Sequence, residues 1–175
     1  MIKNIILSGL LLFCLPGIAQ KPVPQNWLKK ITPSSDSLPT KERQRILTAS
    51  LSEAGSQRKN ILVFSPSAKT TKDKDALFIR RSENKEIYKV NIPMVVSDKI
   101  SETEKNLDRL FTEAGRNSYI LFFDEAGDLF SRTGQAEVTM NYIQSLAQSK
   151  NVITIFWCEE DCLKWLKKGS YVLVK

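Results

Sequence analysis

An acidic pair directly after an apolar run is the feature of this sequence most suited to chemistry. Residues 119–123 read YILFF, and Asp124 and Glu125 follow at once. A buried strand that runs into Asp-Glu is typical of enzymes that hydrolyse nucleotides, where the Asp holds Mg²⁺ and the Glu polarises the attacking water. An acidic residue at the end of a strand can also simply cap the next helix. Asp124 and Glu125 are therefore candidate catalytic residues, and Asp124 is the candidate metal ligand.

Composition excludes several other kinds of active site. The 175 residues include 26 Lys+Arg against 19 Asp+Glu, three Cys and no His. Without His there is no Ser-His-Asp or Cys-His nucleophile and no HExxH zinc site, and three Cys are too few for an all-thiolate zinc site. The basic residues are scattered and form no arginine-rich stripe, so we expect no nucleic-acid binding. The length suits one domain with a substantial core.

Apolar runs alternate with helical patterns along the chain. Apolar residues at helical spacing follow residue 40 and begin again at residue 140, which predicts a helix at each place. Ser101 with Glu104 has the form of a capping box at the start of a third helix. The stretch from residue 72 to 85 is compatible with a helix or a hairpin. Strands that alternate with helices indicate an open, mostly parallel sheet, whose chemistry lies at the carboxyl ends of the strands. The expected strands are residues 61–64, 87–94, 119–123, 152–157 and 171–174.

Two segments at a fixed separation closely resemble the AAA ATPase family. They are SETEKNLDRLF at residues 101–111 and ILFFDEAGDLF at residues 120–130. The resemblance extends more weakly over residues 60–174. It implies an α/β fold, namely a three-layer αβα P-loop NTPase-like core with a five-stranded, mostly parallel sheet of order 5-1-4-3-2.

The phosphate-binding loop that the resemblance requires is degenerate. Family members carry a glycine-rich loop after the first strand, and this chain has SPSAKTTK at residues 65–72. Without gaps, the family's lysine falls on Thr71, whereas a two-residue deletion brings Lys69 to its place. The missing glycines matter because a Cβ hinders positive φ and close approach of backbone to phosphate. The candidate nucleotide-binding residues are Ser65, Lys69, Thr70, Thr71 and Lys72.

Other positions depart from the family in the same direction. Cys158 stands where a polar sensor residue is expected, and Lys167 and Lys168 stand where paired arginines are expected. We also expect the core to lack the family's helical lid. These departures favour a pseudo-ATPase, meaning a scaffold or interaction module without a cofactor and with an unidentified protein partner, as a monomer or weak oligomer. The alternative is an ATP-binding, Mg²⁺-dependent ATPase that uses Asp124 and Glu125 with an atypical phosphate loop.

The N-terminus has the layout of a secretory signal peptide. Residues 1–19 place Lys3 before an apolar run, then Pro16, then small residues up to Ala19. Cleavage before Gln20 would export the protein from a bacterium into the periplasm or medium, with no stable membrane span. We expect residues 20–39 to be a Pro/Ser-rich leader, in which an exposed Trp27 would contact a partner, and residues 40–175 to be the AAA-like core.

Two cysteines near the C-terminal end lie close in sequence. Cys158 and Cys162 are separated by three residues, unlike the Cys-x₂-Cys redox motif. In an oxidising compartment they could form a disulfide, and otherwise they are small buried hydrophobic residues. The spacing alone leaves both possibilities open.

Overall fold

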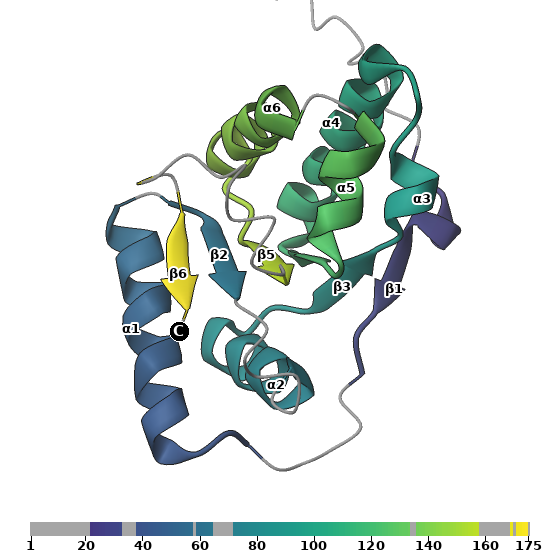
Figure 1. The fold of residues 1–175 in the computed structure, drawn as a ribbon. Helices are drawn as coiled ribbons and strands as arrows, with labels where there is room; N and C mark the ends of the chain where they lie inside the picture. Colours follow the sequence, from purple (N-terminus) through teal and green to yellow (C-terminus); the bar gives the residue numbers. More distant parts are fainter. Residues whose placement is uncertain are drawn as a thin grey trace, which may run out of the picture.

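Six strands form a single sheet in a computed structural model of the chain (Figure 1). The structure describes residues 22–32, 38–57, 59–64, 72–133, 136–157, 169 and 171–174. The strands are β1 (Leu28–Lys30), β2 (Ile61–Phe64), β3 (Ile87–Val90), β4 (Ile120–Phe123), β5 (Thr154–Trp157) and β6 (Val172–Val174). The helices are η1 (Gln25–Trp27), α1 (Lys41–Ser56), α2 (Lys72–Glu83), α3 (Ile92–Val95), α4 (Ile100–Asn117), α5 (Ala126–Thr133) and α6 (Ala136–Ser149).

The sheet has the predicted parallel core with one strand added. Its order is β1-β3-β4-β5-β2-β6, and every pair from β3 to β6 is parallel. Counted from β2, this is the order 5-1-4-3-2, so the prediction is confirmed. The addition is β1, which pairs antiparallel with β3 at the edge. Phe64 lies opposite Trp157 and Phe123 opposite Phe156, so three central strands end together at the carboxyl edge.

Helices cover both faces of the sheet and complete three layers (Figure 1). Along β2, Ile61 and Val63 belong to one hydrophobic cluster, and Leu62 and Phe64 belong to the other. This alternation follows from the two-residue period of a strand. The first cluster packs under α4, α5 and α6, and the second packs under α1 and α2. Both faces are therefore buried, which explains why the central strands are continuously apolar.

Two local predictions need correction, and one open question is answered. Residues 72–83 form helix α2 and no hairpin. Strand β3 stops at Val90, short of the predicted residue 94, because Pro93 lies in the first turn of α3. The capping box at Ser101 was wrong, since α4 begins one residue earlier and Ser101 is inside it. Instead, the Thr103 hydroxyl accepts from the Ser97 N–H at 2.9 Å and donates to the Ser97 carbonyl at 3.0 Å.

The segment that the sequence suggested was a leader is partly built into the domain. Trp27 is only 8% exposed, which overturns the expectation of an exposed Trp27. The Arg109 guanidinium lies 5.1 Å from the Trp27 ring centre, and the Val23 N–H donates to Glu113 at 2.9 Å. The Asn91 N–H donates to the Trp27 carbonyl at 2.8 Å, which carries the chain into β1. Residues 22–30 thus cover an otherwise open sheet edge.

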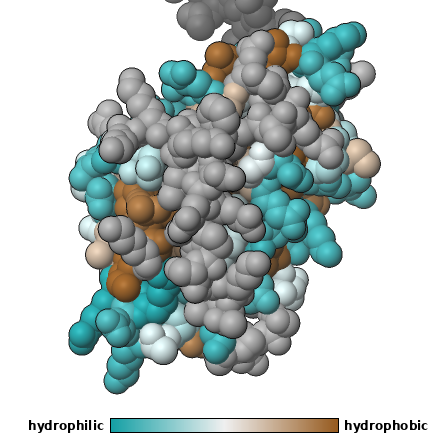
Figure 2. All heavy atoms as spheres, viewed as in Figure 1, coloured by the Kyte–Doolittle hydropathy of each residue, from teal (hydrophilic) through white to brown (hydrophobic). Residues whose placement is uncertain are grey.

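The described surface shows no extended apolar face in the view of Figure 2, where brown hydrophobic side chains lie in separate patches among teal hydrophilic ones. The large hydrophobic residues most exposed among the described ones come from separate places in the chain, namely Leu38, Ile46, Met94 and Val138. No helix in the described ranges is long and apolar enough to cross a membrane. The predicted signal peptide at residues 1–19 lies outside the described residues.

Candidate functional site

The carboxylate of Asp124 lies between two lysines at the carboxyl edge of the sheet. Asp124 directly follows β4 and is 9% exposed. Lys89 Nζ donates to Asp124 Oδ2 at 2.7 Å, and Lys72 Nζ donates to Asp124 Oδ1. Each carboxylate oxygen therefore carries its own ammonium partner. Within the described residues, both hydrogen bonds of the Asp124 carboxylate go to side chains, whereas a cap of α5 would accept from a backbone N–H.

Strand register explains why Lys89 reaches this carboxylate. Lys89 on β3 lies opposite Phe122 on β4, so both side chains leave the same face of the sheet. Asp124 is two residues beyond Phe122 and, by the same alternation, also emerges on that face. The flexible side chain of Lys89 then brings its ammonium group to the Asp124 carboxylate at the end of β4. A neighbouring parallel strand thus supplies a cation to the acidic residue.

Lys72 is held by aromatic rings as well as by Asp124. It is the first residue of α2, and its ammonium lies 5.5 Å from the centre of the Phe122 ring and 5.6 Å from that of Trp157. Such cation–π contacts contribute about 0.5–2 kcal/mol each, depending on how dry the site is. The Trp157 ring is itself stacked on Phe64 at 5.4 Å. The end of β2, the end of β5 and the start of α2 are therefore joined around one ammonium group.

The two lysines keep Asp124 ionised. Burial raises the pKa of the Asp124 carboxyl, whereas the hydrogen bonds and charges of Lys72 and Lys89 lower it. The lowering wins, so the pKa of Asp124 lies below its ordinary value of 3.8. An ionised carboxylate between two ammonium groups is a compact charge cluster with one excess positive charge.

Glu125 does not share this arrangement, although it is the next residue. Its side chain is exposed, and among the described residues it makes no ion pair. Its backbone is left-handed, with φ of 57°, a conformation that residues other than glycine rarely adopt. The structure thus places Asp124 and Glu125 at one turn but gives them different surroundings.

The described residues do not fit a resident Mg²⁺ at Asp124. Mg²⁺ takes six oxygen ligands in near-octahedral geometry. Both oxygens of Asp124 already accept from ammonium groups, which repel a cation. In the described part of the chain, no group of three or more His, Cys, Asp or Glu side chains is arranged so that it could hold a metal ion. The metal assignment of Asp124 therefore finds no support in this geometry.

A cavity of about 530 Å³ lies between the N-terminal segment and the ends of β3 and β4. Its lining includes Asn26 and Lys29 of the N-terminal segment, Lys89 of β3, and the acidic residues Asp124, Glu125 and Asp128. Charges of both signs therefore face the same space. Through this cavity, solvent reaches the Lys89 side of Asp124.

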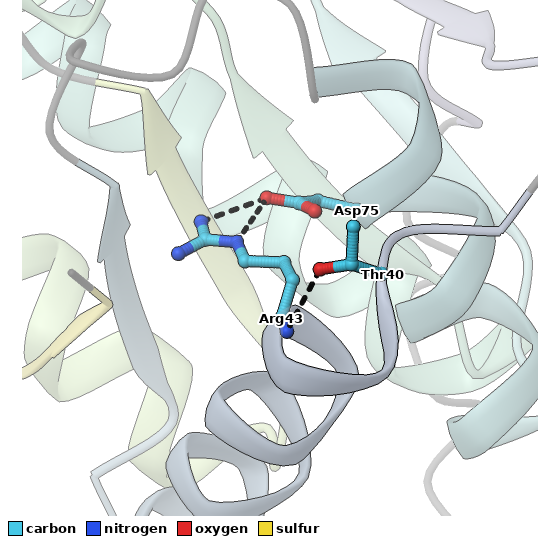
Figure 3. Close-up of polar contacts among 3 residues, drawn as sticks. All are labelled: Thr40, Arg43 and Asp75. Atoms are coloured by element: carbon cyan, nitrogen blue, oxygen red, sulfur yellow. Dashed lines mark hydrogen bonds and ion pairs between the residues drawn. The ribbon is translucent and has the colours of Figure 1, made fainter.

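A second charged pair joins α1 to α2 near the same edge (Figure 3). Arg43 Nε and Nη2 donate to one oxygen of Asp75 at 3.0 and 2.8 Å. The Thr40 hydroxyl accepts from the Arg43 N–H at 3.3 Å and so caps α1. The Arg43 guanidinium also lies 5.8 Å from the Phe64 ring centre. This pair fixes the first turns of both helices beside the end of β2.

Of the site residues predicted from the sequence, the structure brings Lys72 and Asp124 together and leaves Glu125 separate. The prediction missed Lys89, whose only signal was a basic residue inside the short apolar strand IYKV. Six predicted residues lie outside the described ranges, namely Ser65, Lys69, Thr70, Thr71, Cys158 and Cys162.

The fold and the acidic strand end define the class of P-loop NTPase-like domains, with a parallel three-layer core of order 5-1-4-3-2. Residues 68–160 match the family described as "ATPase family associated with various cellular activities (AAA)". That match covers more than half of the chain, so the chain belongs to the AAA family.

A solved AAA domain agrees with this fold. The FIGL-1 AAA domain, crystallised in complex with ADP, is 13% identical with a TM-score of 0.53, over 85% of this chain and 59% of that one. A chain of the HORMA:CdnC:Trip13 complex from E. coli MS115-1 is also 13% identical, with a TM-score of 0.47, over 75% of this chain and 59% of that one. This chain thus spans about three-fifths of the solved chains it matches. No curated protein matches this sequence.

Proposed function

We propose that this AAA domain is a pseudo-ATPase that serves as a scaffold or interaction module for a protein partner. The observation that carries the proposal is the pairing of both Asp124 oxygens with lysines, at 2.7 Å for Lys89. An acidic residue engaged in this way cannot also hold a divalent cation. The proposal therefore treats Asp124 as a structural anion within the domain.

Loss of the cation would remove the main electrostatic contribution to hydrolysis. In phosphoryl transfer, bound metal and positively charged groups stabilise charge on the transferred group, and loss of one such element costs several powers of ten in rate. The sequence from residue 65 to 72 supports the same conclusion, since SPSAKTTK lacks the glycines of a phosphate-binding loop. The two observations share Lys72 but concern different properties, namely the pairing of the Asp124 carboxylate and the absence of glycine from residues 65–72.

The test is phosphate release from Mg·ATP by the wild-type protein and by the Asp124→Asn variant. We expect both proteins to give the same rate as the buffer background. Turnover by the wild type that disappears in Asp124→Asn would overturn the proposal. Turnover that survives in the variant would instead point to a contaminating ATPase.

Nucleotide binding without turnover is a second candidate, which the position of Lys72 favours. Lys72 begins α2 beside Asp124, at the carboxyl edge where P-loop proteins bind phosphate. A ligand that binds only the folded state stabilises it and so raises the melting temperature. At a ligand concentration 100 times the Kd, the free energy of unfolding rises by about 2.7 kcal/mol. A melting temperature raised by Mg·ATP in wild type but not in Lys72→Met would support this candidate. An unchanged temperature at millimolar nucleotide would remove it.

Export and a protein partner complete the proposal. The charge, apolar run, Pro16 and small residues of segment 1–19 support a cleaved signal peptide, and the scattered basic residues support a partner other than nucleic acid. We propose a monomer or weak oligomer. Fractionation of cells that express the full chain, followed by N-terminal sequencing, tests export, and a first residue of Gln20 is the expected result.

A further inference from the structure

Lys89 differs from Lys72 in what holds its ammonium group. Lys72 contacts two aromatic rings in addition to Asp124, whereas the contact of the Lys89 ammonium within the described residues is Asp124 alone. The Lys89 side chain is 43% exposed and lines the 530 Å³ cavity. Its ammonium therefore contacts Oδ2 of Asp124 at the wall of that cavity.

We infer that the Lys89 ammonium, by its hydrogen bond to Oδ2 of Asp124, excludes divalent metal ions from the end of β4. A divalent ion that enters the cavity meets an ammonium group 2.7 Å from that oxygen. The two cations compete for the same lone pairs and repel one another. This inference deepens the proposed function, because it names the residue that makes the acidic strand end unfit for a metal.

The arrangement does not depend on the loop between β2 and α2. Lys89 is placed by the β3–β4 register, in which it lies opposite Phe122. Antiparallel β1 pairs with the other edge of β3, and Trp27, just before β1, is buried in the same hydrophobic cluster as Val90 of β3. Lys89 thus comes from a strand held on both sides, which keeps its ammonium near Asp124.

Removal of Lys89 would leave Oδ2 of Asp124 facing the cavity, next to the exposed Glu125. Oxygen ligands from carboxylates, with water in the remaining positions, suit Mn²⁺ and Mg²⁺. Loss of one positive charge in contact with the site favours cation binding by about tenfold or more, depending on the local dielectric constant. The prediction is therefore a gain of metal binding on substitution.

Lys29 provides a matched control. It lies directly opposite Lys89 in the β1–β3 register, lines the same cavity and is exposed. Within the described residues it forms no ion pair with Asp124 or any other acid. Lys29→Met therefore removes the same charge from the same cavity without freeing an oxygen of Asp124.

The experiment is a Mn²⁺ titration followed by the EPR signal of the free ion, with wild type, Lys89→Met, Lys29→Met, Asp124→Asn and the double variant Lys89→Met/Asp124→Asn. We expect Lys89→Met to bind Mn²⁺ about tenfold more tightly than wild type, Lys29→Met to resemble wild type, and the double variant to lose the gain. Circular dichroism checks that each variant is folded. Lys89→Gln, which keeps a neutral donor, replaces Lys89→Met if the latter does not fold.

Four results would overturn the inference. The first is no gain of Mn²⁺ binding in folded Lys89→Met, and the second is an equal gain from Lys89→Met and Lys29→Met. The others are a gain that persists when Asp124 is also replaced, and wild-type Mn²⁺ binding that Asp124→Asn abolishes. None of these results requires ATP, so the inference can fail while the proposed lack of turnover stands. Conversely, Asp124-dependent ATP hydrolysis by wild type would refute the proposed function whatever the metal titration shows.

Discussion

Arg43 and Asp75 join the first turn of α1 to the first turn of α2 through two hydrogen bonds to a single carboxylate oxygen. Asp75 is 1% exposed to solvent, and the Arg43 side chain is 14% exposed. Arg43 also lies over Phe64, the last residue of β2. One guanidinium therefore connects both helices of this face to the strand that precedes the candidate phosphate loop.

Replacement of Arg43 tests this connection. We expect Arg43→Met to lower the free energy of unfolding by about 2–4 kcal/mol, because it withdraws a charged partner from a buried carboxylate. Arg45→Met is the matched control, since Arg45 is an exposed arginine on the same helix, and it should change stability by less than about 0.5 kcal/mol. Urea denaturation followed by circular dichroism measures both. Equal effects of the two substitutions would contradict a specific role for Arg43.

Acid should weaken the Asp124 cluster in a defined range. The pKa of Asp124 is lowered in the folded protein, so its stabilising contribution is complete above its ordinary value of 3.8 and is lost as the pH falls below that value. At pH 7 we expect Asp124→Asn to be about 1–3 kcal/mol less stable than wild type. The difference should shrink below pH 3.8. Urea denaturation at a series of pH values measures it, and a gap that closes well above that pH would indicate a raised pKa instead.

Replacement of two helical glycines by alanine should change the stability of the protein in opposite directions. A Cβ on Gly115 of α4 would lie 2.9 Å from the Lys150 carbonyl oxygen, whereas a Cβ on Gly55 of α1 would meet nothing within 4 Å. We expect Gly115→Ala to destabilise the protein by about 1–3 kcal/mol through overpacking against backbone. Gly55→Ala should stabilise it by about 0.5–1 kcal/mol through helix propensity. Thermal melts compare the two, and a stabilising Gly115→Ala would show that α4 and the turn after α6 can move apart.

Truncation of Trp27 should release the N-terminal segment. Trp27→Ala removes a side chain that is 8% exposed and the ring beneath Arg109. We expect a loss of up to about 3 kcal/mol and faster amide exchange at Asn91, whose N–H donates to the Trp27 carbonyl. Gln25→Ala, an exposed change in the same short helix, is the control. Hydrogen–deuterium exchange of intact protein provides the readout, and unchanged protection at Asn91 would contradict the docking of this segment.

The sheet could be predicted because its signals are local. Runs such as ILVF at β2 and ILFF at β4 are apolar at every position, and a strand buried on both faces requires such a sequence. The start of α4 was placed less well. The sequence pattern pointed to Ser101 with Glu104, whereas the fold begins α4 at Ile100 and bonds Thr103 of its first turn to the backbone of Ser97. Short-range capping patterns can be satisfied at more than one position, so they do not fix a boundary by themselves.

The sequence by itself determined the apolar parallel strands and the acidic end of β4, since periodicity and a contiguous motif are properties of neighbouring residues. The order of the strands followed from the resemblance to the AAA family. Only the tertiary structure decided which cations meet Asp124. Lys72 and Lys89 are 52 and 35 residues away from it in the chain. Strand register and the packing of α2 bring them together, and those depend on contacts between distant segments. The same holds for Trp27, which is buried through contacts with Arg109 of α4 and with Asn91, the residue after β3.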